Sequence, residues 1–334
     1  MGNIHSTEHL CENRSVKRYR LFARKLIDDA SSTHSHIGSE TNISSSNSPI
    51  FKNIGGRTYN VAENEIYLLP NDWREADRLH EQHYMLKFIF DGNYESYIKE
   101  SLEKDARVLD IACGSATWML EMAHEFENVE FHGIDISPIF PSEIKPPNTH
   151  FTLANVLDGI PFPDDHFDMV AMRMAIGCWN DEHWPAVMAE IYRVLKPGGY
   201  VQLLEPDNTF WRIEAERQEI WKKWNALQMN RGCDMYIGRR IQKFIHSSGF
   251  ENIQKRYMST PLNWGGPIGK LCNDTWLGLM MASAPRVADQ LGYTEEDFEK
   301  ECYALTKYSE SVQGYINFHV ATGRKPVRVI KEAA

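Results

Sequence analysis

Three features are scarce in this sequence of 334 residues: long apolar runs, paired cysteines and clustered positive charge. No apolar run reaches the ~18 residues of a membrane-spanning helix, and the N-terminus lacks the apolar core of a signal peptide. The six cysteines show no CxxC or Cys/His zinc spacing, so we expect reduced thiols without disulfides or a metal. A net charge of -10 at pH 7 argues against a nucleic-acid partner, because phosphate binding needs clustered Lys and Arg.

The first 50 residues are predicted to form a tail outside the folded part. Residues 31–50 are rich in Ser, Thr and Asn, which favours a disordered linker. The segment 13–29, NRSVKRYRLFARKLIDD, has the pattern of a basic amphipathic helix. Gly2 followed by Ser6 fits the myristoylation pattern, and the basic segment or an acyl group on Cys11 supplies the second signal that firm attachment needs. Two interpretations of this tail remain. Either Gly2 is acylated and the tail makes peripheral membrane contact, or the myristoylation pattern matches by chance and the basic segment is a solvated tail.

Between residues 106 and 206 the sequence alternates between strand and helix patterns. Strands are predicted at 106–111, 129–136, 150–156, 167–174 and 199–206, and helices at 117–126 and 182–195. This alternation predicts βαβ units, and therefore an α/β fold with a parallel sheet and helices on both faces. KPGG at 196–199 is predicted to cap the second helix, with glycine in the left-handed position.

The remaining segments complete this domain, which we place at residues 106–334. Residues 51–105 are mostly helical in pattern and form an N-terminal cap. Further helices are predicted at 209–230 and 239–250, strands at 251–262 and 311–323, and a helical lid insertion at about 268–310.

The stretch VLDIACGSATWML, residues 108–120, runs from a buried strand through small residues into a helix. Such a turn forms a nucleotide or nucleoside cradle, because the first N–H groups of the helix are free and small side chains leave room. In the dinucleotide pattern GxGxxG, the third glycine would stand where this chain has Thr117. That substitution weakens the dinucleotide interpretation.

The same stretch resembles the GxGxG turn of class I S-adenosylmethionine methyltransferases, whose typical form is VLDIGCGTG. Gly114, the central glycine, is retained, whereas Ala112 and Ala116 replace the outer two. Alanine is tolerated wherever φ is negative. The resemblance implies S-adenosylmethionine as cofactor and a Rossmann-like, seven-stranded, mostly parallel sheet.

Further family positions follow in order. Asp135 ends the second strand, where the family's carboxylate accepts both ribose hydroxyls; the alternative is a helix cap or a solvated turn. LANVLDGIPFPDDHFDMV resembles the family's GDAxxLPFPDxSFDVV segment, with Asn155 in the place of the adenine-binding aspartate and Val156 offering its N–H; Asn155 is alternatively a turn residue. The resemblance implies cofactor contacts from Asp110, Ala112, Cys113, Gly114, Asp135, Ile136, Asn155, Val156 and Arg173.

Two more segments extend the resemblance over about residues 60–325. EIYRVLKPGGYVQLLEPD is similar to the family's ERVLKPGGxLxxxE segment. Residues 63–90 resemble the N-terminal cap of fungal methyltransferases of the secondary-metabolism regulator type, with its YxLPND and DRLxxQH motifs.

Candidates for a catalytic base are Glu205 and Asp207, since ligands bind beyond the carboxyl ends of parallel strands, together with His183. His80 and His83 are also candidates; all five have structural alternatives in packing, capping or solvation. Seven aromatic residues near the predicted mouth form either a pocket floor or ordinary core: Trp118, Trp179, Trp184, Phe210, Trp211, Trp221 and Trp224.

Three functions are compatible with these patterns. The first is a methyltransferase acting on a small-molecule O, N or carboxylate acceptor. The second is an S-adenosylmethionine-binding regulator of secondary metabolism that acts through protein partners. The third is a scaffold that has lost the cofactor through Ala112 and Ala116. A cytoplasmic location is expected, with the nucleus as the alternative, and the oligomeric state is left open.

Overall fold

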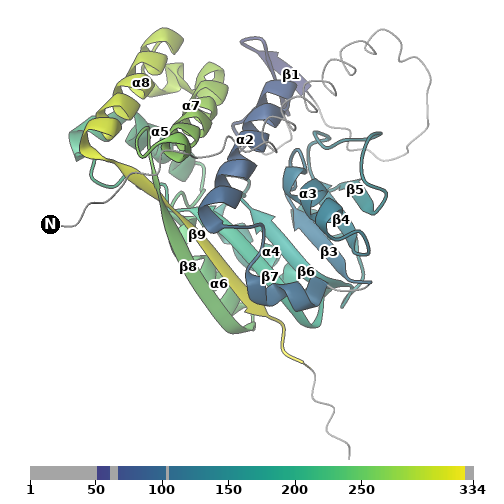
Figure 1. The fold of residues 1–334 in the computed structure, drawn as a ribbon. Coiled ribbons are helices and arrows are strands. Elements are labelled where there is room, and N and C mark those ends of the chain that lie inside the picture. Colours follow the sequence, from purple (N-terminus) through teal and green to yellow (C-terminus); the bar gives the residue numbers. More distant parts are fainter. Residues whose placement is uncertain (1–50, 61–66, 103–104, 328–334) are drawn as a thin grey trace, which may run out of the picture. The chain divides into compact units, whose positions relative to one another are not determined.

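The computed structural model describes residues 51–60, 67–102 and 105–327, and its centre is a seven-stranded sheet (Figure 1). The strand order is β5-β4-β3-β6-β7-β9-β8. β9 runs antiparallel to both neighbours and the other paired strands run parallel. The predicted α/β class and mostly parallel sheet are thereby confirmed. The strands are β3 (Arg107–Ile111), β4 (Glu130–Asp135), β5 (Thr149–Leu153), β6 (Phe167–Arg173), β7 (Leu195–Pro206), β8 (Glu251–Pro261) and β9 (Tyr315–Arg324).

The strand order reverses at β3, which lies between β4 and β6. The chain steps from β3 to β4 and β5 on one side, then returns to β6 and β7 on the other. Connections leave the sheet in opposite directions at such a point, so a crevice opens beyond the carboxyl ends of the strands. Asp135 and Arg173 are the last residues of β4 and β6 and stand at this edge.

Helices cover both faces of the sheet. On one face α3 (Thr117–Glu125) and the short helix η1 (Ser96–Leu102) pack on β3, β4 and β6 around a core that includes Trp118, Phe131 and Met169. On the other face α4 (Trp184–Val194) and α6 (Ile241–Ser247) pack around Ile111 and Val170. Both faces are buried because the central strands carry apolar side chains in both directions.

A third core lies among helices beyond the sheet: α2 (Trp73–Phe90), α5 (Glu219–Asn230), α7 (Pro267–Val287) and α8 (Glu295–Val312). In Figure 1, α5, α7 and α8 gather over the β8–β9 end, and α2 stands between them and α3. Asp72 caps α2 by accepting a hydrogen bond from the Glu75 backbone N–H, and Asp72 is itself held by Arg57. The start of α2 is therefore fixed by a residue from outside the helix.

Several local predictions differ from the structure. Residues 51–60 form a hairpin, β1 (Phe51–Ile54) and β2 (Arg57–Asn60), because Gly55 and Gly56 both adopt positive φ and make the turn. KPGG belongs to β7 rather than to a helix cap, since α4 ends at Val194 and Leu195 is already extended. Residues 209–214 are not helical. The remaining short helices are η2 (Val156–Asp158), η3 (Asp181–His183), η4 (Ala215–Gln218), η5 (Ile237–Arg239) and η6 (Asp289–Leu291).

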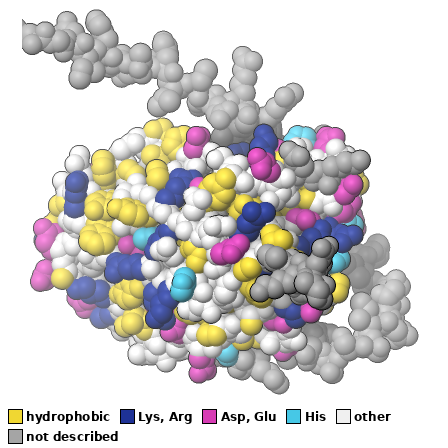
Figure 2. All heavy atoms as spheres, turned by 90° about the horizontal axis from the view of Figure 1, so that it is seen from below, with side chains coloured by type: hydrophobic (Ala, Val, Ile, Leu, Met, Phe, Trp, Pro, Cys, Tyr) yellow, Lys and Arg dark blue, Asp and Glu magenta, His cyan; other side chains and the backbone are white. Residues whose placement is uncertain are grey.

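The described surface carries charges of both signs. Figure 2 shows one face, where basic side chains lie singly or in small groups among acidic and apolar ones. Within the described residues, none of the helices combines the length and apolarity that crossing a bilayer requires. The predicted acylation pattern at Gly2 and the basic segment 13–29 lie outside the described residues and stay predictions.

Candidate functional site

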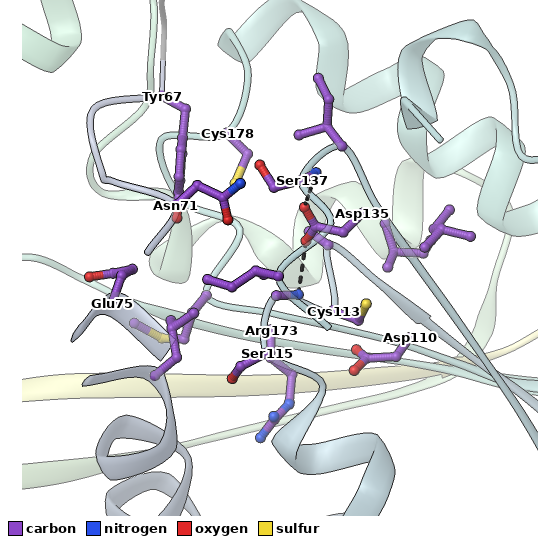
Figure 3. Close-up of a pocket in the computed structure, with 18 of the residues that line it drawn as sticks. Tyr67, Asn71, Glu75, Asp110, Cys113, Ser115, Asp135, Ser137, Arg173 and Cys178 are labelled. Carbon is purple, nitrogen blue, oxygen red and sulfur yellow. Dashed lines mark hydrogen bonds between the residues drawn. The ribbon is translucent and has the colours of Figure 1, made fainter. Parts of the chain in front are cut away.

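A pocket occupies the crevice at the carboxyl edge of β3, β4 and β6 (Figure 3). Its wall is formed by the turn after β3, the ends of β4 and β6, the start of η2 and one side of α2. All nine residues predicted to contact the cofactor line it: Asp110, Ala112, Cys113, Gly114, Asp135, Ile136, Asn155, Val156 and Arg173. They come from four separate segments of the chain that the sheet topology brings to one place.

Two backbone hydrogen bonds hold the Asp135 side chain in place at the pocket. Its Oδ2 accepts a hydrogen bond from the Gly114 backbone N–H at 2.8 Å, and its Oδ1 accepts one from the Ser137 N–H at 2.8 Å. Burial raises the pKa of this carboxyl, and the backbone donors oppose that shift. The two bonds join the tip of β4 to the turn after β3 and fix the carboxylate's orientation at the pocket wall.

The turn after β3 is strained. Ala112 and Ala116 both adopt positive φ, 53° and 59°, as does Gly114 at 53°. The expectation that alanine is tolerated here was stated for negative φ, so the structure corrects it: both alanines sit in a conformation that the methyl group disfavours. A Cβ on Gly114 would lie 3.3 Å from Leu79 Cδ1 of α2. Glycine at the centre adopts this φ without strain and leaves room for the close approach of α2.

Asp110 and Arg173 form a buried, oppositely charged pair at the inner end of the pocket. Asp110 is only 3% exposed, and burial raises its pKa to about 7 although the charge of Arg173 opposes the shift. Burial lowers the pKa of Arg173 to about 10. The Arg173 guanidinium lies over the Trp118 ring, 5.2 Å from its centroid. Arg173 is therefore charged at neutral pH, whereas Asp110 carries its charge only above about pH 7, and in this poorly solvated site each charge acts strongly on a bound ligand.

Asn155 and Val156 line the pocket from the start of η2. The Asn155 side-chain oxygen accepts a hydrogen bond from the Leu157 N–H at 3.1 Å and caps η2. An amide oxygen has two lone pairs, so this cap leaves one acceptor position. The turn role that was an alternative for Asn155 is present, together with its place on the pocket wall.

Sequence reasoning did not assign pocket roles to Tyr67, Asn71 and Glu75, which line the pocket together with Cys178 (Figure 3). The only signal was the cap resemblance at 63–90, whose YxLPND motif contains Tyr67 and Asn71 but gives no contacts, and whose motifs do not include Glu75. Glu75 is 1% exposed and forms an ion pair with Arg78 at 2.6 Å. Burial raises the pKa of the Tyr67 phenol and of the Cys178 thiol well above their usual values.

Comparison with known proteins decides the family. The model of the methyltransferase domain family matches residues 82–255. The chain belongs to this methyltransferase family. It is 30% identical to the protein-methionine methyltransferase laeA of Emericella nidulans over 302 residues, which are 83% of this chain and 77% of that protein. It is 24% identical to the N-methyltransferase gliN of Aspergillus fumigatus over 276 residues, covering 78% of this chain and 96% of the relative.

Among solved structures, phosphoethanolamine N-methyltransferase 2 of Haemonchus contortus in complex with S-adenosyl-L-methionine matches with a TM-score of 0.46 and 16% identity. The match covers 78% of this chain and 54% of that protein, so this chain spans about half the length of that structure.

S-adenosylmethionine is the cofactor of this methyltransferase family, and two observations fit the pocket to it. The glycine at position 114 leaves open the space that a Cβ would take beside α2. Arg173 Nε is buried and has no hydrogen-bond partner in the described part of the chain, although a buried donor is normally satisfied. A ligand carrying an acceptor group would complete it.

The three residues chosen as catalytic do not line the methyltransferase pocket. Glu205 is fully buried, and its oxygens accept hydrogen bonds from the Ala175 and Ile176 N–H groups at 2.8 and 3.1 Å. Asp207 bonds to the Thr209 N–H and to Asn317 Nδ2. His183 lies in η3. The strand-end rule placed Glu205 at the correct edge, but its side chain points into the loop after β6 instead of into the crevice.

Only some of the aromatic residues expected near the pocket line it, and the predicted lid does not. Trp118 and Trp179 line the pocket, whereas Trp184, Phe210, Trp221 and Trp224 belong to the buried cores, and Trp211 is 39% exposed. No residue of α7 or α8 is among the described residues that line the pocket. These helices connect β8 with β9 at the far end of the sheet, and α2 covers the pocket in their place.

Proposed function

We propose that this protein transfers the methyl group of S-adenosylmethionine to a small-molecule acceptor whose lone pair is free at the working pH, such as a carboxylate or an amine that is neutral at that pH. S-adenosylmethionine supplies an activated methyl group on a sulfonium, so the protein's task is alignment and exclusion of water. Asp135 would hold the ribose, Asn155 and Val156 the adenine, and Asp110 with Arg173 the amino-acid end. The acceptor would enter beside Tyr67, Glu75 and Cys178.

The observation that carries this proposal is the state of the ionisable side chains lining the pocket, apart from Asp110, whose pKa is about 7 and which the proposal assigns to the amino-acid end of the cofactor. Glu75 is bonded to Arg78, Asp135 to two backbone N–H groups, and His83 to Glu121. Tyr67 and Cys178 are protonated because burial raises their pKa. Alcohols and phenols need a general base within reach. An acceptor that needs none suits the groups that are present.

The test is methyl transfer from radiolabelled S-adenosylmethionine to matched sets of amines, carboxylic acids, alcohols and phenols. We expect label in the amine or carboxylate set, with base-labile label identifying a methyl ester. An Asp135→Ala variant is the control, because it should lose transfer with every acceptor. Transfer confined to alcohols or phenols would contradict the proposal.

A second candidate is a regulatory role through a protein acceptor. The laeA relative is named a protein-methionine methyltransferase, and a thioether sulfur is another lone-pair acceptor that needs no base. Met174 lines the pocket of this chain. Mass spectrometry of the protein and of co-purifying partners after reaction distinguishes the two candidates, because only the regulatory role adds a methyl group to a polypeptide. For either role we propose a cytoplasmic location, with the nucleus as the alternative for a regulator.

A further inference from the structure

The guanidinium of Arg173 lacks the partner that its burial calls for. Its Nε has no hydrogen-bond partner in the described part of the chain. Its Nη1 and Nη2 make only long contacts, 3.4 and 3.5 Å, to Nδ1 of His83. One face of the group is covered by the Trp118 ring. A guanidinium in this state is suited to a planar, bidentate acceptor such as a carboxylate.

His83 connects Arg173 to the cap helix. Its Nε2 lies 2.8 Å from Glu121 Oε2 of α3, while Nδ1 faces Arg173 at the end of β6. Since the carboxylate can only accept, Nε2 carries the proton and donates to Glu121, and Nδ1 is the acceptor turned toward Arg173. His83 of α2 thereby contacts both Glu121 of α3 and Arg173 of β6.

His83 is neutral, as this arrangement requires. It is 3% exposed, and burial lowers its pKa to about 4; Arg173 and Lys87 lower it as well, against the hydrogen bond and charge of Glu121. A protonated ring would present N–H to the guanidinium and repel it. Glu121 is in turn held by hydrogen bonds from Lys87 and Asn93, so the chain Glu121–His83–Arg173 is anchored at its far end.

We propose that His83 is a positioning residue, which holds Arg173 as the anchor for the amino-acid carboxylate of S-adenosylmethionine. This inference rests on the cofactor site of the proposed function. The methionine part contains the only carboxylate of the cofactor, and Asp110 stands beside Arg173 as a partner for the neighbouring amino group. The cap helix therefore takes part in selecting the amino-acid end of the cofactor and does more than cover it.

Two probes that differ in the amino-acid part test this inference by calorimetry on the full chain. S-adenosylhomocysteine has the carboxylate, and 5′-methylthioadenosine lacks it but keeps the adenosine and the thioether. We expect His83→Ala to weaken S-adenosylhomocysteine binding about tenfold, in line with ~1.4 kcal/mol for one lost orienting contact. Binding of 5′-methylthioadenosine should change less than about twofold, because both proteins would keep the same adenosine contacts.

His80→Ala is the matched control. His80 lies on the same helix and contacts Thr117 of α3, but it does not line the pocket. This variant should leave the ratio of the two affinities unchanged. Arg173→Met should lose S-adenosylhomocysteine binding selectively, and adding His83→Ala to it should cause no further loss.

The outcomes separate this inference from the proposed function. Equal weakening of both probes by His83→Ala would mean that His83 only supports the fold, and unchanged binding of both would mean that it does not act on Arg173. If Arg173→Met left S-adenosylhomocysteine affinity intact, Arg173 would serve an acceptor carboxylate and the inference would be wrong. Failure of the unaltered protein to bind either probe would overturn the cofactor site itself.

Discussion

The Asp135 carboxylate at the tip of β4 accepts a hydrogen bond from the Gly114 backbone N–H, 2.8 Å away in the turn after β3. These residues are 21 positions apart in the chain and meet because β3 and β4 are neighbouring parallel strands. The bond orients the carboxylate and holds the strained turn. The first prediction follows from it.

Replacing Asp135 with alanine should weaken S-adenosylmethionine binding by about 100-fold or more. The variant would lose the proposed hydrogen bonds from the two ribose hydroxyls to the carboxylate, and a hydrogen bond to a charged group contributes roughly 1.5–3 kcal/mol. Calorimetric titration measures the loss. Asp164→Ala is the control, because that side chain is 74% exposed and lies outside the pocket. An Asp135→Ala variant that binds as tightly as the unaltered protein would refute the ribose role.

Relief of backbone strain should stabilise the protein. Ala112 holds φ at 53°, so Ala112→Gly should raise the free energy of unfolding by about 1 kcal/mol despite the greater flexibility of glycine in the unfolded chain. Urea denaturation measures it. Ala154→Gly is the matched control: it is also a partly buried pocket residue but has no positive φ, so it should lose stability. An equal decrease in the free energy of unfolding in both variants would show that the positive φ of Ala112 does not destabilise the protein.

Cofactor binding should depend on pH through Asp110. Burial raises its pKa to about 7, so in the folded protein the carboxyl is protonated below that pH and ionised above it. The ionised form attracts a cationic amino group, so affinity for S-adenosylhomocysteine should fall as pH decreases from 8 to 6, by at most about tenfold per unit. Asp110→Asn should bind more weakly at pH 8 and show a flat profile. If the affinity of Asp110→Asn for S-adenosylhomocysteine still depended on pH, the titrating group would be a residue other than Asp110.

Glu205 should govern stability rather than chemistry. Burial raises its pKa from 4.5 to about 8, so between these values the folded state holds a proton that the unfolded state has released, and stability falls as pH rises. Glu205→Gln should unfold more easily, by about 1–3 kcal/mol at pH 5.5, because one backbone N–H loses its acceptor. The deficit should shrink at pH 8. A deficit that grows toward pH 8 would show that the carboxylate is the form that stabilises the loop.

Much of the sheet and of the cofactor wall could be predicted from local patterns. Buried strands such as 107–111 are rich in apolar residues because helices cover both faces, and the small residues around Gly114 mark a turn where a ligand approaches the backbone. Asp135 could be predicted because a right-handed crossover fixes where the next strand ends. These features depend on short stretches of chain and one topological rule.

Glu205, Asp207 and His183, the side chains predicted to be catalytic, do not line the pocket, and their catalytic role stays a prediction. The orientation of a side chain at a strand end is not a local property. Glu205 ends its strand at the correct edge, yet its carboxylate is drawn to two free N–H groups in the loop after β6. The insertion at 267–312 is helical as expected, but its helix α7 packs against α2, and the insertion does not line the pocket.

The sequence by itself determined the fold class, the small-residue turn after β3 and the set of side chains at the ends of β4 and β6, since periodicity and strand order dictate these. Only the tertiary structure decided that α2 closes the pocket, that His83 reaches Arg173, and that Ala112 and Ala116 adopt positive φ. The physical reason is that such contacts join elements far apart in the chain, and packing of the whole molecule, rather than local propensity, selects them.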